Sequence, residues 1–309
     1  MAPGDPWLSV VMPVFNGERY LEQALESVRA EGAAGCEVVA IDDGSSDRSP
    51  EILRAWERRL PLRILRGRGG NWVAATNAGL REARGEYACF LHQDDLWLPG
   101  RLAALRREAE SGPALILHPA LFVGPDGGRL GTWRCPLPEG EVEARLLVER
   151  LLVQNFIAAP APAFARKAVL RVSGMDESLW YTADWDLWLK LARQGPIRHV
   201  GSALAAFRVH GESQTVRRRE PGDRRRQLET VLERHSGGAP SAVRRAARFS
   251  LELNLALAAG ANGSPFPWRA LLQAFSRLGP ASGARYLRDS RIVERIRARL
   301  RVRGALAPG

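Results

Sequence analysis

Short apolar runs alternate with amphipathic segments through residues 8–91 of this chain. The runs are Leu8 to Val14, Glu37 to Ile41, Leu62 to Leu65 and Tyr87 to Leu91. Apolar side chains recur at helical spacing after Asn16, which can cap a helix, and again over about residues 50–59 and 72–83. Strands that alternate with helices through short turns are typical of a parallel sheet covered by helices. We therefore predict an α/β fold.

Acidic side chains follow two of these strands. Asp42 and Asp43 end the second run, and Asp94 and Asp95 come just after the fourth. In open α/β sheets the carboxyl ends of the strands form the edge at which ligands bind. Adjacent carboxylates repel one another and lose hydration, so a ligand, a metal or a basic neighbour must offset that cost. The pattern predicts a binding site at this edge.

The segment from residue 99 to residue 216 carries a mixture of elements. We expect a helix with Pro99 as its first residue, strands within 114–123, a helix over 140–154, an irregular or edge segment over 155–165, a helix over 184–194 and strands within 197–209. Residues 1–216 form one domain in this interpretation.

The net charge of +11 is concentrated in the last third of the chain. Residues 217–309 hold 20 basic and 7 acidic side chains. We interpret residues 217–226 as a solvated hinge, and helical patterns follow at about 241–259, 267–278 and 283–302. Such helices can dock on an anionic membrane surface, or they can form a subdomain that packs on the rest of the chain or on a partner subunit. Nucleic acid is not an expected partner, because no aromatic platform or recognised module accompanies the arginines.

Cysteine usage and the first residues bear on where the protein works. Cys36, Cys89 and Cys135 are widely spaced, so neither a disulfide framework nor a zinc site is expected. Residues 1–6 lack a basic and then apolar signal segment, and no run approaches the ~20 apolar residues of a membrane span. We expect a cytoplasmic protein, soluble or peripheral at the inner face of the cell membrane.

A series of motifs runs in order from residue 9 to residue 210. They are Ser9-Val10-Val11-Met12-Pro13-Val14-Phe15-Asn16-Gly17, Val39-Ala40-Ile41-Asp42-Asp43-Gly44-Ser45-Ser46-Asp47, Asn77-Ala78-Gly79 with Ala83-Arg84-Gly85-Glu86, Phe90-Leu91-His92-Gln93-Asp94-Asp95-Leu96-Trp97-Leu98-Pro99, Gly174-Met175-Asp176-Glu177, Asp184-Trp185-Asp186-Leu187-Trp188 and Arg208-Val209-His210. Together they resemble the family 2 glycosyltransferases of GT-A fold, over roughly residues 7–215. The resemblance implies a GT-A (Rossmann-like), mostly parallel central sheet flanked by helices, with a nucleotide-sugar half over about 7–110, an acceptor half over about 111–216 and a helical basic C-terminal region over 217–309.

The resemblance also implies a nucleotide-sugar as co-substrate. Asp42 and Asp43 would lie at the nucleotide, with UDP or dTDP favoured because a carboxylate can accept the imide N–H of uracil or thymine. The other residues implied in donor binding are Pro13, Phe15, Asn16, Asn77, Gln93, Asp94 and Arg208. Taken without the family, the segment from Asp42 to Asp47 is also compatible with an Asx turn that caps the next helix.

A divalent cation is implied on the donor's diphosphate, held by Asp94, Asp95 and His210. Mn²⁺ or Mg²⁺ suits carboxylate oxygens and would neutralise the leaving nucleoside diphosphate. His92 departs from the family pattern, because many relatives carry the first acid of an Asp-X-Asp motif there. Asp95 could instead cap the helix near Pro99.

Asp184 resembles the general base that takes the proton of the acceptor hydroxyl as it attacks the anomeric carbon, which inverts that centre. Ala183 stands where family members often carry a glutamate, and Asp184 could otherwise cap the helix that follows. Trp180 and Tyr181, just before it, could stack on the acceptor sugar.

These residues predict an inverting, metal-dependent glycosyltransferase of hexosyltransferase type. Its acceptor would be a hydroxyl of a glycan, a lipid-linked saccharide or a small metabolite, as in bacterial cell-envelope polysaccharide biosynthesis. A catalytically lapsed relative that binds nucleotide or serves as a scaffold is the alternative, and so is an anionic-surface binder that works through the basic tail. A nucleotidyltransferase would need a glycine-rich basic loop after the first strand, which Pro13 to Gly17 does not provide.

Overall fold

The computed structural model describes residues 5–211, 221–261, 265–294 and 296. These residues form two compact units. The first contains the described residues up to Glu143 together with Ile157–Val209, and the second contains Ala144–Phe156 and the described residues from His210 onward. A boundary at residue 216 alone does not describe this division, because residues 144–156 belong with the C-terminal helices. Cys36, Cys89 and Cys135 are buried free thiols.

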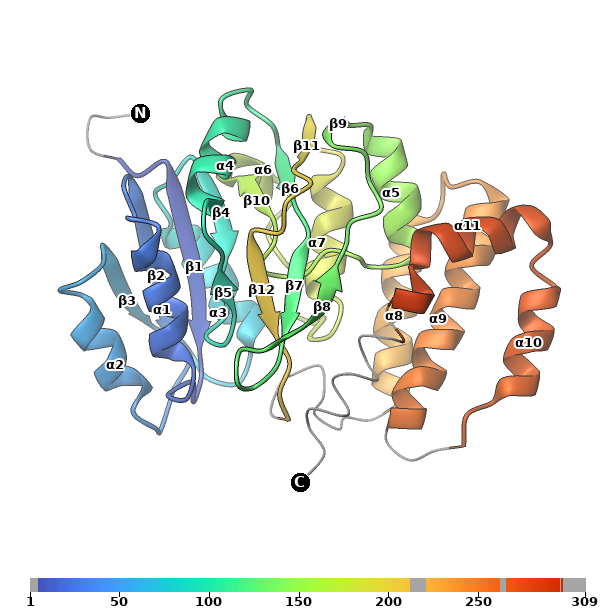
Figure 1. The fold of residues 1–309 in the computed structure, drawn as a ribbon, viewed down its shortest axis with the longest axis horizontal. Helices are drawn as coiled ribbons and strands as arrows, with labels where there is room; N and C mark the ends of the chain where they lie inside the picture. Colours follow the sequence, from blue (N-terminus) through green and yellow to red (C-terminus); the bar gives the residue numbers. More distant parts are fainter. Residues whose placement is uncertain (1–4, 212–220, 262–264, 295, 297–309) are drawn as a thin grey trace. The chain divides into compact units, whose positions relative to one another are not determined.

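An eight-stranded sheet forms the centre of the first unit, in the order β3-β2-β1-β4-β10-β6-β11-β9 (Figure 1). The strands are β3 (Leu62–Arg66), β2 (Cys36–Asp42), β1 (Leu8–Val14), β4 (Tyr87–Phe90), β10 (Ala163–Ala165), β6 (Leu115–Leu117), β11 (Ile197–His199) and β9 (Gly140–Val142). The first four are parallel to one another, and Val10 pairs with both Val38 and Cys89. β1 is buried along its whole length, which explains its continuous apolar sequence. The mostly parallel α/β sheet that we predicted is confirmed.

Helices connect and cover these strands. They are α1 (Leu21–Ala30), α2 (Ser49–Trp56), α3 (Trp72–Glu82), α4 (Arg101–Ala109), α6 (Arg166–Arg171) and α7 (Ala183–Leu191). α3 packs on β1 and β2, and it lies close to them because residue 79 is a glycine. A Cβ atom at Gly79 would be 2.5 Å from Ile41 Cδ1 and 2.6 Å from Val11 Cγ1. The glycine of the Asn77-Ala78-Gly79 motif therefore permits close packing of helix on sheet.

A second sheet of four strands, in the order β5-β12-β7-β8, belongs to the same unit. Its strands are β5 (Leu96–Trp97), β12 (Ala205–Arg208), β7 (Ala120–Val123) and β8 (Arg129–Trp133). Phe122, Trp133 and Phe207 pack together on it, with ring centroids 5.0 Å apart for Phe122 and Trp133 and 5.6 Å apart for Trp133 and Phe207. This sheet brings the segment after β4 next to Arg208.

Two local predictions are wrong and a third holds in part. Asn16 does not cap α1, which begins at Leu21; its backbone has φ 49° and its Oδ1 accepts from the backbone N–H of Ser46. Pro99 is not the first residue of a helix, because α4 begins at Arg101 after Gly100, whose φ is 83°. Residues 155–162 are irregular, as predicted, but residues 163–165 form β10, which runs antiparallel between β4 and β6 and not at a sheet edge.

The second unit is helical. It contains α5 (Ala144–Val153), α8 (Pro221–His235), α9 (Ser241–Ala261), α10 (Trp268–Ser276) and α11 (Pro280–Ser290), and α9 contacts each of the others. Residues 221–226, predicted as part of a hinge, are the start of α8, while 217–220 lie outside the described residues. α11 begins three residues before the predicted start at 283 and is interrupted at Arg291, whose φ is 49°. Residues 292–294 and 296 are helical again, so within the described residues most of the predicted helix over 283–302 is present. None of the helices in the described residues is long and apolar enough to cross a membrane.

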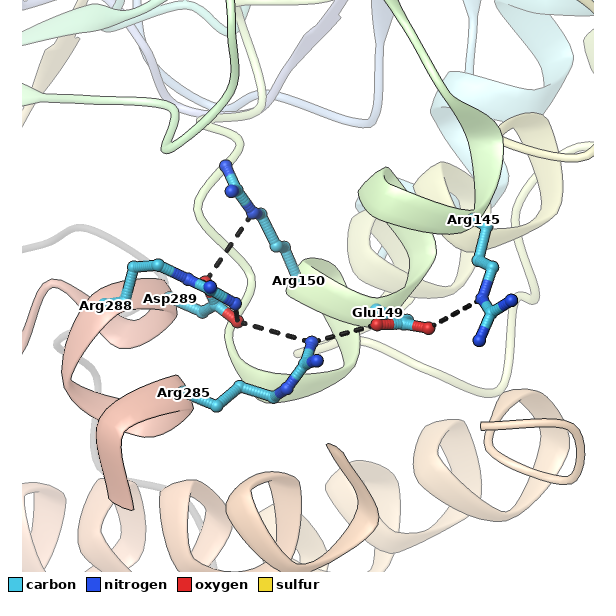
Figure 2. A network of polar contacts seen from close by, with 6 residues as sticks. All are labelled: Arg145, Glu149, Arg150, Arg285, Arg288 and Asp289. Carbon is cyan, nitrogen blue, oxygen red and sulfur yellow. Dashed lines mark hydrogen bonds and ion pairs between the residues drawn. The ribbon is translucent and has the colours of Figure 1, made fainter. Parts of the chain in front are cut away.

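A network of arginines and carboxylates joins α11 to α5 inside this unit (Figure 2). Asp289 is fully buried; Arg288 binds it through Nε at 2.7 Å, and the Nε of Arg150 lies 3.6 Å from it. Arg285 lies 2.9 Å from Glu149 and 4.0 Å from Asp289. These contacts explain why residues 144–156 group with the C-terminal helices.

Candidate active site

The loops after β1 and β4 meet at the carboxyl edge of the parallel strands. β1 lies between β2 and β4, so the order of strands reverses here, and such reversal points are where open α/β sheets bind ligands. The backbone N–H of Phe15 donates to Gln93 Oε1 (2.7 Å), and Gln93 Nε2 donates to the Phe15 carbonyl (3.0 Å). Gln93, predicted at the donor, thus joins the two loops.

The loop after β1 is also tied to the loop after β2. The N–H groups of Asn16, Gly17 and Glu18 donate to the side chains of Ser45 (3.1 Å), Ser49 (2.8 Å) and Asp47 (2.9 Å). Pro13 is buried within β1, whereas Phe15 is 45% exposed at the edge. The predicted donor-binding residues on this loop therefore belong to a rigid rim, with Phe15 on its exposed side.

The two aspartates after β2 have different partners. Asp42 Oδ1 accepts from the backbone N–H of Ser45 (2.9 Å), which is the Asx turn that we considered as an alternative. Asp43 is 6% exposed, and its carboxylate accepts from the N–H groups of Gly69 (2.8 Å) and Asn71 (3.2 Å). Asp43 thereby fixes the glycine-rich loop that leads into α3.

A cluster of ionisable groups surrounds His92. Its Nδ1 lies 3.5 Å from Asp95 Oδ2, and the ring of Trp72 stands edge-on at 5.5 Å between centroids. Burial acts to lower the pKa of His92, but the Asp95 contact and the charges of Asp94 and Asp184 raise it, and the net shift is upward. The charges of Asp94 and Asp184 therefore act on the same imidazole that Asp95 contacts. The structure thus brings the predicted metal-binding segment and the predicted base into one cluster.

Asp95 is the deepest member of this cluster. It is 1% exposed, and its Oδ1 accepts from the backbone N–H of Arg208 (3.0 Å). Burial and the neighbouring charge of Asp94 raise its pKa to about 6, against the opposing effects of His92 and the Arg208 N–H. Its carboxylate therefore already has partners within the protein, whereas Asp94 lies nearer the surface.

Arg208 is also buried, at 1% exposure. Its guanidinium donates to the carbonyls of Asp94 (2.9 Å), Gly124 (3.1 Å) and Pro125 (3.3 Å) and to Gln23 Oε1 (2.9 Å). It also lies over the ring of Tyr20, 4.5 Å from the centroid. These contacts let Arg208 hold the Asp94 loop in place, and the donor contact predicted for Arg208 stays a prediction.

Asn77 faces the segment before α7. Its Oδ1 accepts from the backbone N–H of Met175 (3.0 Å), and its Nδ2 donates to the Met175 carbonyl (2.8 Å) and to Glu177 Oε1 (3.0 Å). The side chain is buried and its amide is fully used by these bonds, so Asn77 organises residues 175–177.

Trp180 and Tyr181, predicted at the acceptor, follow in the same segment, with ring centroids 5.4 Å apart. Asp184 lies in the first turn of α7 and accepts from the N–H of Trp185 (2.7 Å). Trp72 Nε1 donates to the Trp180 carbonyl (3.0 Å). The predicted acceptor residues and the predicted base thus lie on one short stretch that is braced from α3.

A metal site was tested against the carboxylates of this cluster. Within the described residues, no three His, Cys, Asp or Glu side chains are gathered as a ready-made set of metal ligands. His210 is buried and belongs to the second unit. Mg²⁺ commonly takes only one or two protein carboxylates and completes its shell with substrate phosphates and water. Asp94 fits such a minimal site, and the metal ligands remain a prediction.

Sequence reasoning missed Tyr20 and Gln23, which hold Arg208, and left Trp72 unassigned. Tyr20 and Gln23 lie at the start of α1, and Arg208 lies at the end of β12, more than 180 residues away in sequence. No local pattern relates them. The motif that contains Asn77 could be identified in the sequence, but the pairing of Asn77 with Met175 could not be predicted from it.

The fold and the sequence agree with known proteins. Over 96% of this chain and 90% of the other, it is similar to the structure of Staphylococcus aureus TarS 1–349 in complex with UDP-GlcNAc, with TM-score 0.69 and 17% identity. The mannosyltransferase PcManGT from Pyrobaculum calidifontis, in complex with GDP-Man and Mn²⁺, is similar with TM-score 0.57 and 18% identity over 96% of this chain and 87% of that one. These likenesses define the fold as GT-A, with additional C-terminal helices.

Glycosyl transferase family 2 matches residues 9–171, more than half of the chain, so the protein belongs to this family. A glycosyltransferase of Rickettsia felis is 26% identical over 212 residues, which are 67% of this chain and 35% of that protein. Mycobacterium tuberculosis protein MT1568 is 29% identical over 264 residues, covering 79% of this chain and 81% of that protein. The chain therefore spans about a third of the length of the rickettsial relative.

Proposed function

We propose that the protein is an inverting, metal-dependent glycosyltransferase that moves a sugar from a nucleoside-diphosphate sugar to an acceptor hydroxyl. The observation that carries the proposal is the cluster at the reversal point of the sheet, where Asp95 contacts His92, the charges of Asp94 and Asp184 act on the same imidazole, and Gln93 joins the loop to that after β1. A donor site and a base within one cluster are what a direct displacement at an anomeric carbon requires.

The donor half of the site uses the loops after β1, β2 and β3. Asp43, held by Gly69 and Asn71, would accept the imide N–H of the base, and the exposed Phe15 would lie beside the nucleoside. UDP and dTDP are the favoured carriers, since uracil and thymine share that imide edge. TarS binds UDP-GlcNAc and PcManGT binds GDP-Man, so GDP is the competing carrier to test.

Asp94 would hold Mn²⁺ or Mg²⁺ together with the donor's diphosphate oxygens. The bound cation would supply charge neutralisation for the leaving nucleoside diphosphate. Asp95 and Arg208 keep the Asp94 loop in place through the bonds described above. Asp95 and His210 are the further metal ligands that the resemblance to the family implies, and they would complete the set.

Asp184 would take the proton of the acceptor hydroxyl. The hydroxyl oxygen then forms the new bond to the anomeric carbon while the bond to the diphosphate breaks on the opposite face, which inverts that carbon. Trp180 and Tyr181 would position the acceptor, whose class is a glycan, a lipid-linked saccharide or a small hydroxylated metabolite of the bacterial cell envelope.

Calorimetric titration of UDP, dTDP, GDP and ADP, each with Mn²⁺ and again with EDTA, tests the donor site. We expect one pyrimidine diphosphate to bind, and only with the metal. Asp94→Ala should weaken that binding by at least ~10-fold, whereas Glu51→Ala, on the exposed face of α2, should not change it. Absence of binding by all four nucleotides would favour a lapsed relative that acts as a scaffold.

We also propose that the second unit docks on an anionic membrane surface, so that the protein works peripherally in the cytoplasm. Seven large apolar side chains are exposed among the described residues, and five of them lie between residues 268 and 296. Trp268 (65% exposed) and Leu272 (67%) lie one turn apart on α10, and Leu287 (53%) lies on α11. Arg269, Arg277 and Arg288 are exposed among them. This pairing of apolar and cationic side chains suits anionic headgroups.

The acidic side chains of this region do not oppose such docking. Asp289 is buried against Arg150, Arg285 and Arg288, as Figure 2 shows, and Glu294 is paired with Arg291. Sedimentation with vesicles should capture the protein on phosphatidylcholine–phosphatidylglycerol mixtures and not on phosphatidylcholine alone. Leu272→Glu should release it, whereas Leu170→Glu, at an exposed apolar position of the first unit, should not. Concentration-dependent dimerisation without vesicle binding would assign the surface to a second copy instead.

A further inference from the structure

We infer that Asn71 and Asn77 are positioning residues, which fix the segment 174–182 and through it the base Asp184. The inference rests on the proposed function. Segment 174–182 carries Trp180 and Tyr181 and runs directly into α7. Its path is set by side chains of α3 and the residue that caps it.

Asn77 holds the beginning of the segment. Its amide pairs with both backbone groups of Met175, as one strand pairs with another, and its remaining hydrogen binds the carboxylate of Glu177. The approach is so close that a Cβ atom at Gly174 would lie 2.6 Å from Asn77 Oδ1, and Gly174 has φ 69°. The glycine is therefore required both by backbone conformation and by the amide next to it.

Asn71 and Trp72 hold the rest of the segment. The Asn71 Oδ1 caps α3 by accepting from Val73 (3.0 Å) and Ala74 (3.3 Å), while its Nδ2 donates to the Glu177 carbonyl (3.0 Å). Trp72 Nε1 donates to the Trp180 carbonyl (3.0 Å). From the far end of α7, the Nζ of Lys190 returns to the Gly174 carbonyl (3.5 Å).

The same turn of α3 is attached to the donor side. Asp43, which is proposed to bind the nucleobase, accepts from the N–H of Asn71. The Asn71 side chain in turn binds the segment that leads to Asp184, the proposed general base, so one asparagine contacts both sides of the site. Small displacements of reacting groups can cost ~100-fold in rate. The two asparagines thus set the distance between donor and acceptor without touching either.

Isosteric aspartates test this role. Asn77→Asp keeps the acceptor for Met175 N–H but turns a carboxylate toward the Met175 carbonyl and Glu177. Asn71→Asp keeps the oxygen that caps α3 but loses the hydrogen bond to the Glu177 carbonyl. This variant replaces Asn77→Asp in the experiments if Asn77→Asp does not fold. Asn254→Asp is the matched control, because its Nδ2 also donates to a side-chain oxygen, that of Gln154 (3.0 Å), in the second unit.

Hydrogen exchange followed by mass spectrometry is the first measurement. Peptides that cover residues 172–183 should exchange at least ~10-fold faster in Asn77→Asp, and peptides of β1 should not change. The double variant Asn77→Asp/Glu177→Gln again has an amide donor between residues 77 and 177. It should therefore recover part of the protection of residues 172–183 against exchange. Unchanged exchange over 172–183 would overturn the inference whatever the protein's activity.

Enzyme kinetics then separate positioning from mere stability. With the donor that calorimetry identifies, Asn77→Asp should keep the nucleoside diphosphate Kd within ~2-fold and lose ~100-fold in kcat. Faster exchange with an unchanged kcat would overturn the positioning role. Failure of the wild-type protein to bind any nucleotide would instead overturn the proposed function, and the exchange experiment would still decide whether the brace exists.

Discussion

Arg208→Met tests whether Arg208 acts on the protein's own loops or on the donor. The side chain is 1% exposed and gives hydrogen bonds to four oxygen atoms, three of which are backbone carbonyls. Each buried acceptor left without a donor lowers the free energy of unfolding by about 1–3 kcal/mol. Removal of the buried guanidinium charge offsets part of this loss, because that charge no longer has to be desolvated on folding. We expect the free energy of unfolding to fall by about 3 kcal/mol, or the Tm by about 6–12 °C for a unit of this size.

The assay is urea unfolding followed by tryptophan fluorescence, because eight of the nine tryptophans lie in the first unit. Arg208→Lys should fall between wild type and Arg208→Met, since an ammonium cannot reach all four oxygens at once. Arg54→Met is the control; Arg54 is 62% exposed and should change the stability by less than ~0.5 kcal/mol. A stability loss under ~1 kcal/mol together with weaker nucleotide binding would refute the structural role and favour a phosphate contact.

Three further predictions follow from the same site. Asp184→Asn should leave nucleoside diphosphate affinity unchanged and lower kcat by ~10²-fold or more; unchanged turnover would remove Asp184 as the base. Gly79→Ala should destabilise the protein by about 1–3 kcal/mol in urea, because its Cβ would overlap Ile41 and Val11, whereas Gly283→Ala on α11, where the nearest atom is 3.6 Å away, should be neutral or stabilising. In EDTA, the stability contributed by Asp95 and His92 should fall as pH rises from about 4 to above 6.5, since their raised pKa values mean that these two groups bind protons more tightly in the folded protein than in the unfolded chain. The lowered pKa values of His118 and His199 act in the opposite direction, so the measurement is the difference in stability between wild type and His92→Gln, in which those two groups are unchanged. A difference that does not vary with pH over that range would contradict the pH argument.

Local pattern was sufficient for much of the nucleotide half. β1, β2, β3 and β4 and the helix α3 were predicted within one or two residues, because β1, β2 and β4 are buried along almost their whole length and helices alternate with the strands. The acidic pairs were placed correctly at the carboxyl edge for the same reason. β10 was not predicted as a central strand. Its three residues have no pattern of their own, and they form a strand within the sheet only by pairing with β4 and β6.

The candidate site divides in the same way. Its residue types, the three aspartate clusters and the family to which they belong could be identified from the sequence, because a motif preserves spacing along the chain. Their partners could not. Arg208 is held by Tyr20 and Gln23, and Asn77 pairs with Met175, through contacts between residues about 100 to 190 positions apart.

The sequence by itself therefore determined the class of fold, its strands and the chemical groups at the edge of the sheet. Only the tertiary structure decided which of those groups face one another, and it shows that Asn77, Gln93 and Arg208, all predicted at the donor, also hold the loops of the site. The physical reason is that hydrogen-bond partners are chosen by distance in space. Burial then fixes the choice, because an amide or guanidinium removed from water must satisfy its donors within the fold.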